Sequence, residues 1–283
     1  MYNEERIEFA KRYGFKSMEL LVGYDNVFYP GQNNWKEKAH EIKAIYDRAD
    51  IEIFSIGGFY NNVLDEKTSN DKIKNVENVI LLAKEMNVKV VAGFSGRIVD
   101  KPLEESIPAF KKIWTYLAKF ASDNGVKIAF EHCPMGSYHL PPEGTNMMCT
   151  PEMWEKGFNE VSSEAIGLEY DPSHLICQMI DPIAVIKKFG NRIYHVHAKD
   201  AKINKDIIRN YGIYYNGSIE HCFPGFGDAN WPDIIKELRR IGYSGNLDIE
   251  GGHDLVYRDH ENGLRLEDEG LIIALKYLNQ FIK

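Results

Sequence analysis

Acidic residues and a histidine end four apolar segments of the sequence. The segments read "IAFE", "LEYD", "HVHAKD" and "LDIE", and they present Glu131, Asp171, His197 and Glu250. Three ionised carboxylates repel one another at short range, so a shared site calls for a cation. Oxygen-rich ligands with one imidazole favour Mn²⁺ or Mg²⁺ first, then Co²⁺ or Zn²⁺. Each residue alone can equally be a structural polar group, and it is the four matching positions that predict one divalent metal site.

A second layer of polar residues lies two positions earlier on three of these segments. Side chains alternate along a strand, so His195, Glu169 and Asp248 share faces with the ligand candidates that follow them. We expect this layer to orient the metal ligands. For His195, a hydrogen-bonded core position is an equally good interpretation.

Three further residues could take part in the chemistry. His132 follows Glu131 directly and could act as an extra base for elimination, or it could point outward and hydrogen-bond a loop. Lys199 could hold a substrate oxygen or be a solvated charge at the rim. Arg97 ends the segment "FSGR" and could reach the substrate.

Short apolar runs alternate with amphipathic stretches along the whole chain, which predicts parallel strands covered by helices. The predicted strands are 17–23, 51–58, 88–96, 126–134, 165–174, 193–200 and 246–254. The predicted helices are 4–13, 34–49, 70–87, 104–123, 151–161, 181–189, 231–241 and 267–282. No Pro- or Ser-rich linker divides the chain, so residues 1–283 are interpreted as one domain.

An open doubly wound sheet and a closed (β/α)8 TIM barrel both fit this alternation. No G-x-G-x-x-G motif follows the early strands, and polar residues at the carboxyl ends of several strands favour the barrel. The chain opens directly into a helix, so the first strand of a closed barrel is missing before residue 4. Either the true start lies upstream, or the barrel has an open seam that another subunit could cover.

Composition excludes several classes of protein. The net charge of −8 argues against broad binding to nucleic acid or to an anionic membrane. No apolar run approaches the roughly 20 residues of a membrane span, and the N-terminus lacks a signal-peptide pattern. Reduced thiols in the cytoplasm are the expected state of the scattered cysteines, Cys133, Cys149, Cys177 and Cys222.

The segments "FEHCP", "YDPSH", "HVHAKD", "PGFGDANW" and "GYSGNLDIE" occur in an order and spacing that resemble one known family. The chain resembles the sugar phosphate isomerase/epimerase superfamily, the xylose-isomerase-like TIM barrels. The resemblance implies metal ligation by Glu131, Asp171, His197 and Glu250. It also implies that His174 touches a substrate oxygen.

The expected reaction is isomerisation or epimerisation of a sugar or keto-sugar. A metal that chelates a carbonyl and the neighbouring hydroxyl acidifies the C–H bond between them and stabilises the enediolate. Glu131 and Glu250 would move the proton. An alternative is metal-assisted elimination on a 3-keto-glycoside, as in C-glycoside deglycosidase large subunits, which pair with a small second subunit.

Two readings from other classes remain open. One is a DNA-repair AP endonuclease on the same barrel, which needs three zinc ions and His ligands that the early strand ends do not supply. The other is a non-catalytic barrel subunit. The expected partners are a small carbohydrate and either further copies of this chain or a second small subunit.

Two long segments, 132–150 and 201–228, are predicted to be loops that cover the site. Their aromatic residues could stack on a sugar, pack beneath the loop or contact a neighbouring subunit; they are Tyr138, Tyr211, Tyr214, Tyr215 and Phe226. Trp231 and Phe59 are expected to pack in the core.

Overall fold

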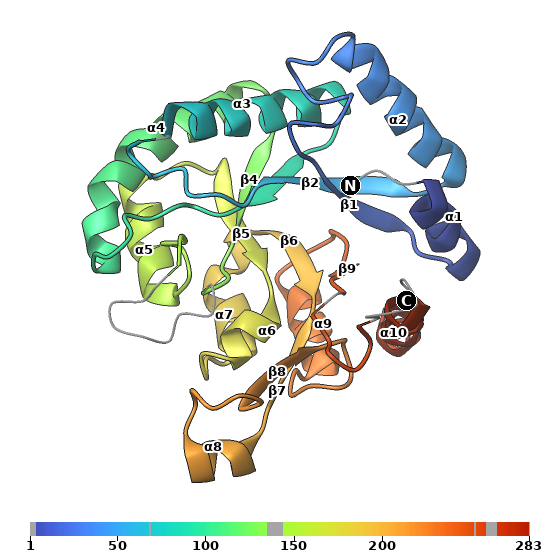
Figure 1. Ribbon diagram of the computed structural model, residues 1–283, viewed down its shortest axis with the longest axis vertical. Coiled ribbons are helices and arrows are strands. Elements are labelled where there is room, and N and C mark those ends of the chain that lie inside the picture. The colour runs from blue at the N-terminus through green and yellow to red at the C-terminus, as the bar shows by residue number, and fades with distance from the viewer. Residues whose placement is uncertain (1–3, 68, 135–143, 252, 259–264, 283) are drawn as a thin grey trace. The chain divides into compact units, whose positions relative to one another are not determined.

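The computed structural model describes residues 4–67, 69–134, 144–251, 253–258 and 265–282 (Figure 1). The chain divides into two compact units, Met1–Glu169 and Tyr170–Lys283. The single-domain interpretation stays a prediction.

The first unit is built on a parallel sheet whose strands follow one another in sequence order. Its strands are β1 (Ser17–Leu21), β2 (Glu52–Phe59), β3 (Val90–Gly93), β4 (Lys127–Glu131) and β5 (Ile166–Tyr170), the last residue of which belongs to the second unit. Every residue of β3 and β5 is buried. Burial on both faces explains why these strands read as continuous apolar runs.

Helices alternate with these strands, as the sequence predicts. They are α1 (Glu4–Tyr13), α2 (Trp35–Ala49), α3 (Ser69–Glu85), the 3₁₀ turn η1 (Leu103–Ser106), α4 (Ile107–Asp123) and α5 (Pro151–Glu160). Thr150 caps α5 by accepting from the Met153 amide, with Pro151 at the first helical position. Gly125 follows α4 with a φ of +69°, which stops the helix in a conformation that glycine adopts without strain.

Aromatic side chains fill the space between α4 and the sheet of the first unit. Trp114 of α4 is fully buried and lies 4.6 Å, centroid to centroid, from Phe130 of β4. Phe59 at the end of β2 packs 6.1 Å from the same indole, which confirms its predicted core position. The Trp114 Nε1–H donates to the Ser95 carbonyl at 2.8 Å, so the buried indole is also satisfied as a donor.

The second unit contains β6 (Ile193–Ala198), which pairs in parallel with β9 (Asp248–Ile249). Its helices are α6 (Pro172–Ile176), α7 (Pro182–Phe189), the 3₁₀ turn η2 (Gly190–Arg192), α9 (Trp231–Arg240) and α10 (Arg265–Leu278). Trp231, at the start of α9, is fully buried as predicted. Its Nε1–H donates to Asp200 Oδ2 at 3.0 Å.

The segment 201–228, which the sequence predicts to be a loop, contains regular secondary structure. It contributes to an antiparallel ribbon of β7 (Asp200–Ile203) and β8 (Ile219–Cys222), with α8 (Lys205–Tyr211) at the far end of that ribbon (Figure 1). The sequence signal is weak because both strands are short and α8 buries none of its residues. The second predicted cover segment, 132–150, lies partly outside the described residues.

All seven predicted strands are present, although β9 is much shorter than predicted. α1 begins at Glu4, the first described residue, so the predicted gap before residue 4 lies outside the described residues and stays a prediction. In the part of the chain that the structure describes, no helix is both long and apolar enough to cross a membrane. Within the described residues, no disulfide joins the four cysteines.

Candidate functional site

Asp171 links the start of a helix to the candidate metal site of the second unit. It is fully buried and caps α6, because its Oδ1 accepts a hydrogen bond from the Ser173 amide at 2.8 Å. Its other oxygen, Oδ2, lies 3.2 Å from His174 Nε2 and 4.0 Å from Lys199 Nζ. The local turn "YDPSH" therefore aims one carboxylate oxygen at an imidazole and an ammonium group.

Glu250 follows β9 directly and its two oxygens have different surroundings. Oε1 lies 2.9 Å from Lys199 Nζ and 3.0 Å from His253 Nε2. Oε2 lies 3.2 Å from His197 Nδ1, but it is buried and accepts no hydrogen bond within the described residues. A buried carboxylate oxygen without a donor costs free energy and is suited to a cation.

Asp171, His197 and Glu250 each offer a ligand atom, and these atoms lie within 4.8 Å of one another. A divalent ion could bind all three with only small side-chain movements, since metal–oxygen and metal–nitrogen bonds are about 2.0–2.2 Å long. The donor set of two carboxylates and one imidazole suits a hard or borderline ion. The residues of the second unit therefore fit the predicted metal.

The pKa shifts in this cluster follow from burial and close charges. Burial raises the pKa of Asp171, against the lowering effect of His174 and Lys199. Burial alone would also raise the pKa of Glu250, but His197, His253 and Lys199 outweigh it and hold that pKa well below its usual range. For His174, burial lowers the pKa to about 4, so its imidazole is neutral at pH 7.

His195 lies below the ligand layer, as its spacing predicts. Its ring is fully buried and packs 5.1 Å from the His197 ring, centroid to centroid. His195 Nε2 lies 2.8 Å from Asp248 Oδ2, which fixes the orientation of the imidazole. Both interpretations of His195, a hydrogen-bonded core position and a residue that orients a metal ligand, agree with this contact, and the second stays a prediction.

Two histidines of this cluster were not found by sequence reasoning. His253 is three residues beyond Glu250 and contacts it, whereas His221 lies on β8. The His221 ring lies 5.5 Å from that of His174 and 6.4 Å from that of His253, centroid to centroid. The sequence "EGGHD" held a signal for His253, because only two glycines separate it from the strand-end glutamate.

Lys199 belongs to the cluster and is not a solvated rim charge. Its side chain is 4% exposed and pairs with Glu250. By contrast, Lys202 and Arg209, farther along the same segment, are exposed. The predicted substrate contacts of Lys199 and His174 stay predictions.

Three predicted site residues lie in the first unit. Glu131 ends β4, is 7% exposed, and its carbonyl oxygen accepts from Asn146 Nδ2 at 2.8 Å. His132 is fully buried and does not point outward; its ring packs 5.0 Å from that of Trp154. The Arg97 guanidinium donates to the carbonyl oxygens of the loop that follows it. The predicted roles of Glu131, His132 and Arg97 in metal binding, proton transfer and substrate binding stay predictions.

The aromatic residues predicted to cover the site are exposed wherever the structure describes them. The exposed fraction ranges from 43% at Phe226 to 66% at Tyr211, with Tyr214 and Tyr215 between these values. Tyr211 and Tyr215 stack on each other at 4.6 Å. Tyr138 lies outside the described residues.

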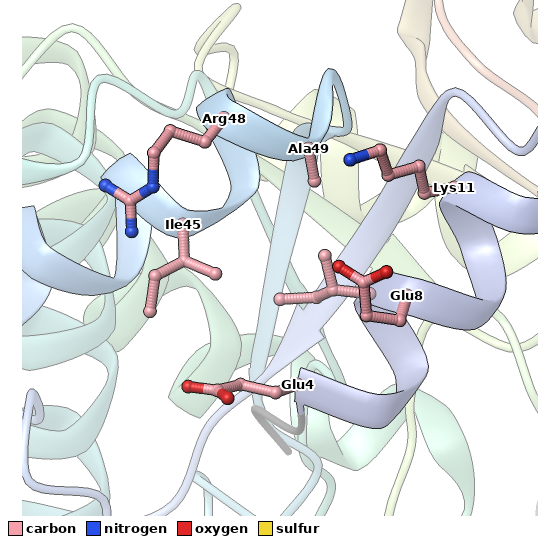
Figure 2. Close-up of a pocket in the computed structure, with 7 residues that line it drawn as sticks. Glu4, Glu8, Lys11, Ile45, Arg48 and Ala49 are labelled. Atoms are coloured by element: carbon pink, nitrogen blue, oxygen red, sulfur yellow. The ribbon is translucent and has the colours of Figure 1, made fainter.

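A surface pocket between α1 and α2 of the first unit is a weaker candidate for chemistry (Figure 2). Figure 2 shows Glu4, Glu8 and Lys11 on one side and Ile45 and Arg48 on the other. These side chains come from helices and not from the carboxyl ends of strands, where parallel α/β folds carry their sites. The pocket therefore does not compete with the cluster around Glu250.

Comparison with known proteins gives partial sequence relatives and close structural neighbours. The chain is 30% identical over 142 residues to an inosose dehydratase of Clostridium beijerinckii, which covers 49% of this chain and 44% of the relative. This chain thus spans about half the length of the curated relatives that it matches.

Two solved structures share the fold across nearly the whole chain. A crystal structure of the IOLI protein with a bound zinc atom has a TM-score of 0.71 at 19% identity, covering 100% of this chain and 95% of the other. The 3-keto-D-glucoside 4-epimerase of E. coli has a TM-score of 0.71 at 14% identity, covering 98% and 94%. A family model matches residues 7–272, which confirms the predicted fold class, and the chain belongs to the xylose isomerase-like TIM barrel family.

Proposed function

We propose that this protein is a divalent-metal-dependent enzyme that moves a proton on the carbon next to a carbonyl group of a sugar or keto-sugar. The single observation that carries the proposal is the buried Glu250 Oε2, which accepts no hydrogen bond from the described residues and lies 3.2 Å from His197 Nδ1. The family supports it, because relatives include a dehydratase and structural neighbours include an epimerase and a zinc-bound protein.

Asp171, His197 and Glu250 would hold the ion, and Glu131 would complete the set. The ion would polarise the substrate carbonyl and offset the charge of the carboxylates. Mn²⁺ is our first choice, because most of the donors are carboxylates, and Zn²⁺ is the second.

Glu250 would accept the proton, because its low pKa keeps the carboxylate ionised at neutral pH. Lys199 and His253, both on Oε1, orient the group and leave Oε2 available. His174 is neutral at pH 7 and would hydrogen-bond a substrate oxygen. The electrons of the broken C–H bond move toward the carbonyl oxygen, and return of a proton to carbon gives the isomer or epimer.

Elimination is the second candidate, and the match to an inosose dehydratase favours it. The first step is the same, but the electrons then expel a leaving group from the next carbon. His132, beside Glu131, would protonate that group. Product analysis separates the two reactions, because one gives an isomer and the other releases water or an aglycone.

The test is solvent deuterium incorporation, measured by mass spectrometry on a panel of ketoses and keto-glycosides with Mn²⁺-loaded protein. Glu250→Gln should lower the exchange rate about a thousandfold, the size expected for loss of a positioned base. The folded state should persist, as judged by circular dichroism. Full exchange in this variant would remove Glu250 from the mechanism, and absence of exchange in the wild type with every sugar would overturn the proposed function.

A further inference from the structure

The β7–β8 ribbon carries a polar side chain that the proposed mechanism does not use. In the ribbon, His221 pairs with Ala201, and the neighbouring residue Cys222 pairs with Asp200. Side chains alternate along a strand, so His221 lies on the opposite face from Asp200. Asp200 turns toward Trp231 and the start of α9. The other face of the ribbon therefore belongs to Ala201 and His221.

That face brings His221 to the histidines around Glu250. Its ring is 5.5 Å from the His174 ring, at 69°, and 6.4 Å from the His253 ring, at 64°. His174 contacts Asp171, and His253 contacts Glu250. His221 is therefore separated by one histidine from each of these two residues that would hold the ion.

One ring nitrogen of His221 receives no hydrogen bond from, and donates none to, the described residues. That nitrogen, Nδ1, is buried. Buried polar atoms of native proteins are nearly always partnered, by protein, water or ligand. A buried ring nitrogen beside a candidate active site is thus an available contact for a substrate.

We propose that His221 binds a hydroxyl group of the substrate that lies beyond the carbonyl and hydroxyl groups at the ion, and that the ribbon thereby selects neutral polyhydroxylated sugars. This inference rests on the proposed function. The charge of the surroundings supports a neutral ligand, because His221 has two imidazoles around it and Lys199 is already paired with Glu250.

The experiment compares His221→Phe, His221→Asn and a control, His40→Phe. Phenylalanine keeps a ring but removes both nitrogens, whereas asparagine keeps a polar atom close to the position of Nδ1. His40 is an exposed residue of α2 in the first unit, and the control carries the same substitution. Each full-length variant is loaded with Mn²⁺ and assayed for deuterium exchange with the sugar that the wild type exchanges fastest.

We expect His221→Phe to raise KM about tenfold, the loss of one buried hydrogen bond to a neutral group, with kcat changed less than threefold. His221→Asn should recover most of the KM, His40→Phe should match the wild type, and all variants should bind one equivalent of Mn²⁺. An unchanged KM in His221→Phe, or no recovery with asparagine, would overturn the role of His221.

The failure of this inference is distinguishable from failure of the proposed function. If deuterium exchange requires the ion and Glu250 but its KM is unchanged by substitution of His221, the proposed function is supported and only the substrate contact of His221 is contradicted. Wild-type protein that exchanges none of the sugars overturns both.

Discussion

The two units satisfy their buried polar groups in different ways. In the first unit, buried polar side chains hold backbone groups; Ser95 Oγ, for example, accepts from the amides of Met147 and Met148, and Asn146 Nδ2 donates to the Glu131 carbonyl. In the second unit, buried Asp171, His174 and Lys199 contact other ionisable side chains. Bonds to the backbone fix a loop, whereas a cluster of ionisable groups can bind an ion and move a proton. The first pattern therefore fixes loops, and the second brings ionisable groups of the proposed site close together.

The sharpest test of this division is His197→Ala in the second unit. Loss of an imidazole ligand should weaken Mn²⁺ binding at least a hundredfold and lower deuterium exchange about a thousandfold. Mass-spectrometric metal analysis after dialysis checks the first effect and the exchange assay checks the second. His40→Ala is the control, since that histidine is exposed and pairs with Glu85 in the first unit. Retention of one equivalent of metal by His197→Ala would contradict the site.

A core substitution in the first unit should instead lower the stability of the fold. Trp114→Ala removes a fully buried indole and is expected to lower the free energy of unfolding by about 3–5 kcal/mol. Urea unfolding measures this effect. Tyr116→Ala, on the exposed side of the same helix, should cost much less. If Trp114→Ala left stability unchanged, the first unit would not depend on this aromatic core.

Asp200 lies in the second unit, but its buried carboxylate binds mainly backbone amides, as the buried polar groups of the first unit do. Its two oxygens accept hydrogen bonds from the amides of Ala201, Gly225 and Ala229 and from the Trp231 indole. Asp200→Asn places an NH₂ group against donors and should cost about 2 kcal/mol in urea unfolding.

Asp206→Asn is the matched control for this carboxylate, since Asp206 is exposed on α8 and forms an ion pair with Arg209. Its effect should stay below about 0.5 kcal/mol. Equal effects of the two substitutions would show that the network around Asp200 does not stabilise the fold.

The smallest expected effect concerns acid sensitivity in the second unit. Burial, with the charge of Lys199, lowers the pKa of His221 to about 3. In the unfolded chain this histidine titrates near 6.5, so from pH 7.5 to 5.5 the unfolded state binds a proton that the folded state does not. The free energy of unfolding that His221 contributes therefore decreases by about 1 kcal/mol as the pH is lowered from 7.5 to 5.5.

Urea midpoints of the metal-free protein at pH 7.5 and 5.5 measure this loss. His221→Phe should lose about 1 kcal/mol less than the wild type between the two pH values. The same loss in both proteins would show that His221 is not held neutral by its surroundings.

Strand–helix alternation was enough to predict most of the fold, because buried parallel strands have a strong apolar signal. The predicted helix 4–13 has the same bounds as α1 in the structure. The ribbon was missed, since β7 and β8 are short and its helix has no buried face to give a periodic pattern.

The candidate site was predictable where a residue ends a long apolar strand, as Asp171 and His197 do. Glu250 was also found, although its strand is short, because the segment "NLDIE" alternates. His221 could not be predicted as a site residue, because its position depends on the pairing of β8 with β7. The local spacing of residues does not reveal which distant segments pair.

The cap of α6 has a consequence for how the ion would be received. Asp171 Oδ1 is fixed by the Ser173 amide, and the carboxylate is a rigid plane, so the direction of Oδ2 is set by the backbone before any ion arrives. A ligand held in this way has little rotational freedom left to lose. The first turn of a short helix would thereby spare Asp171 most of the rearrangement that ion binding requires of a mobile side chain.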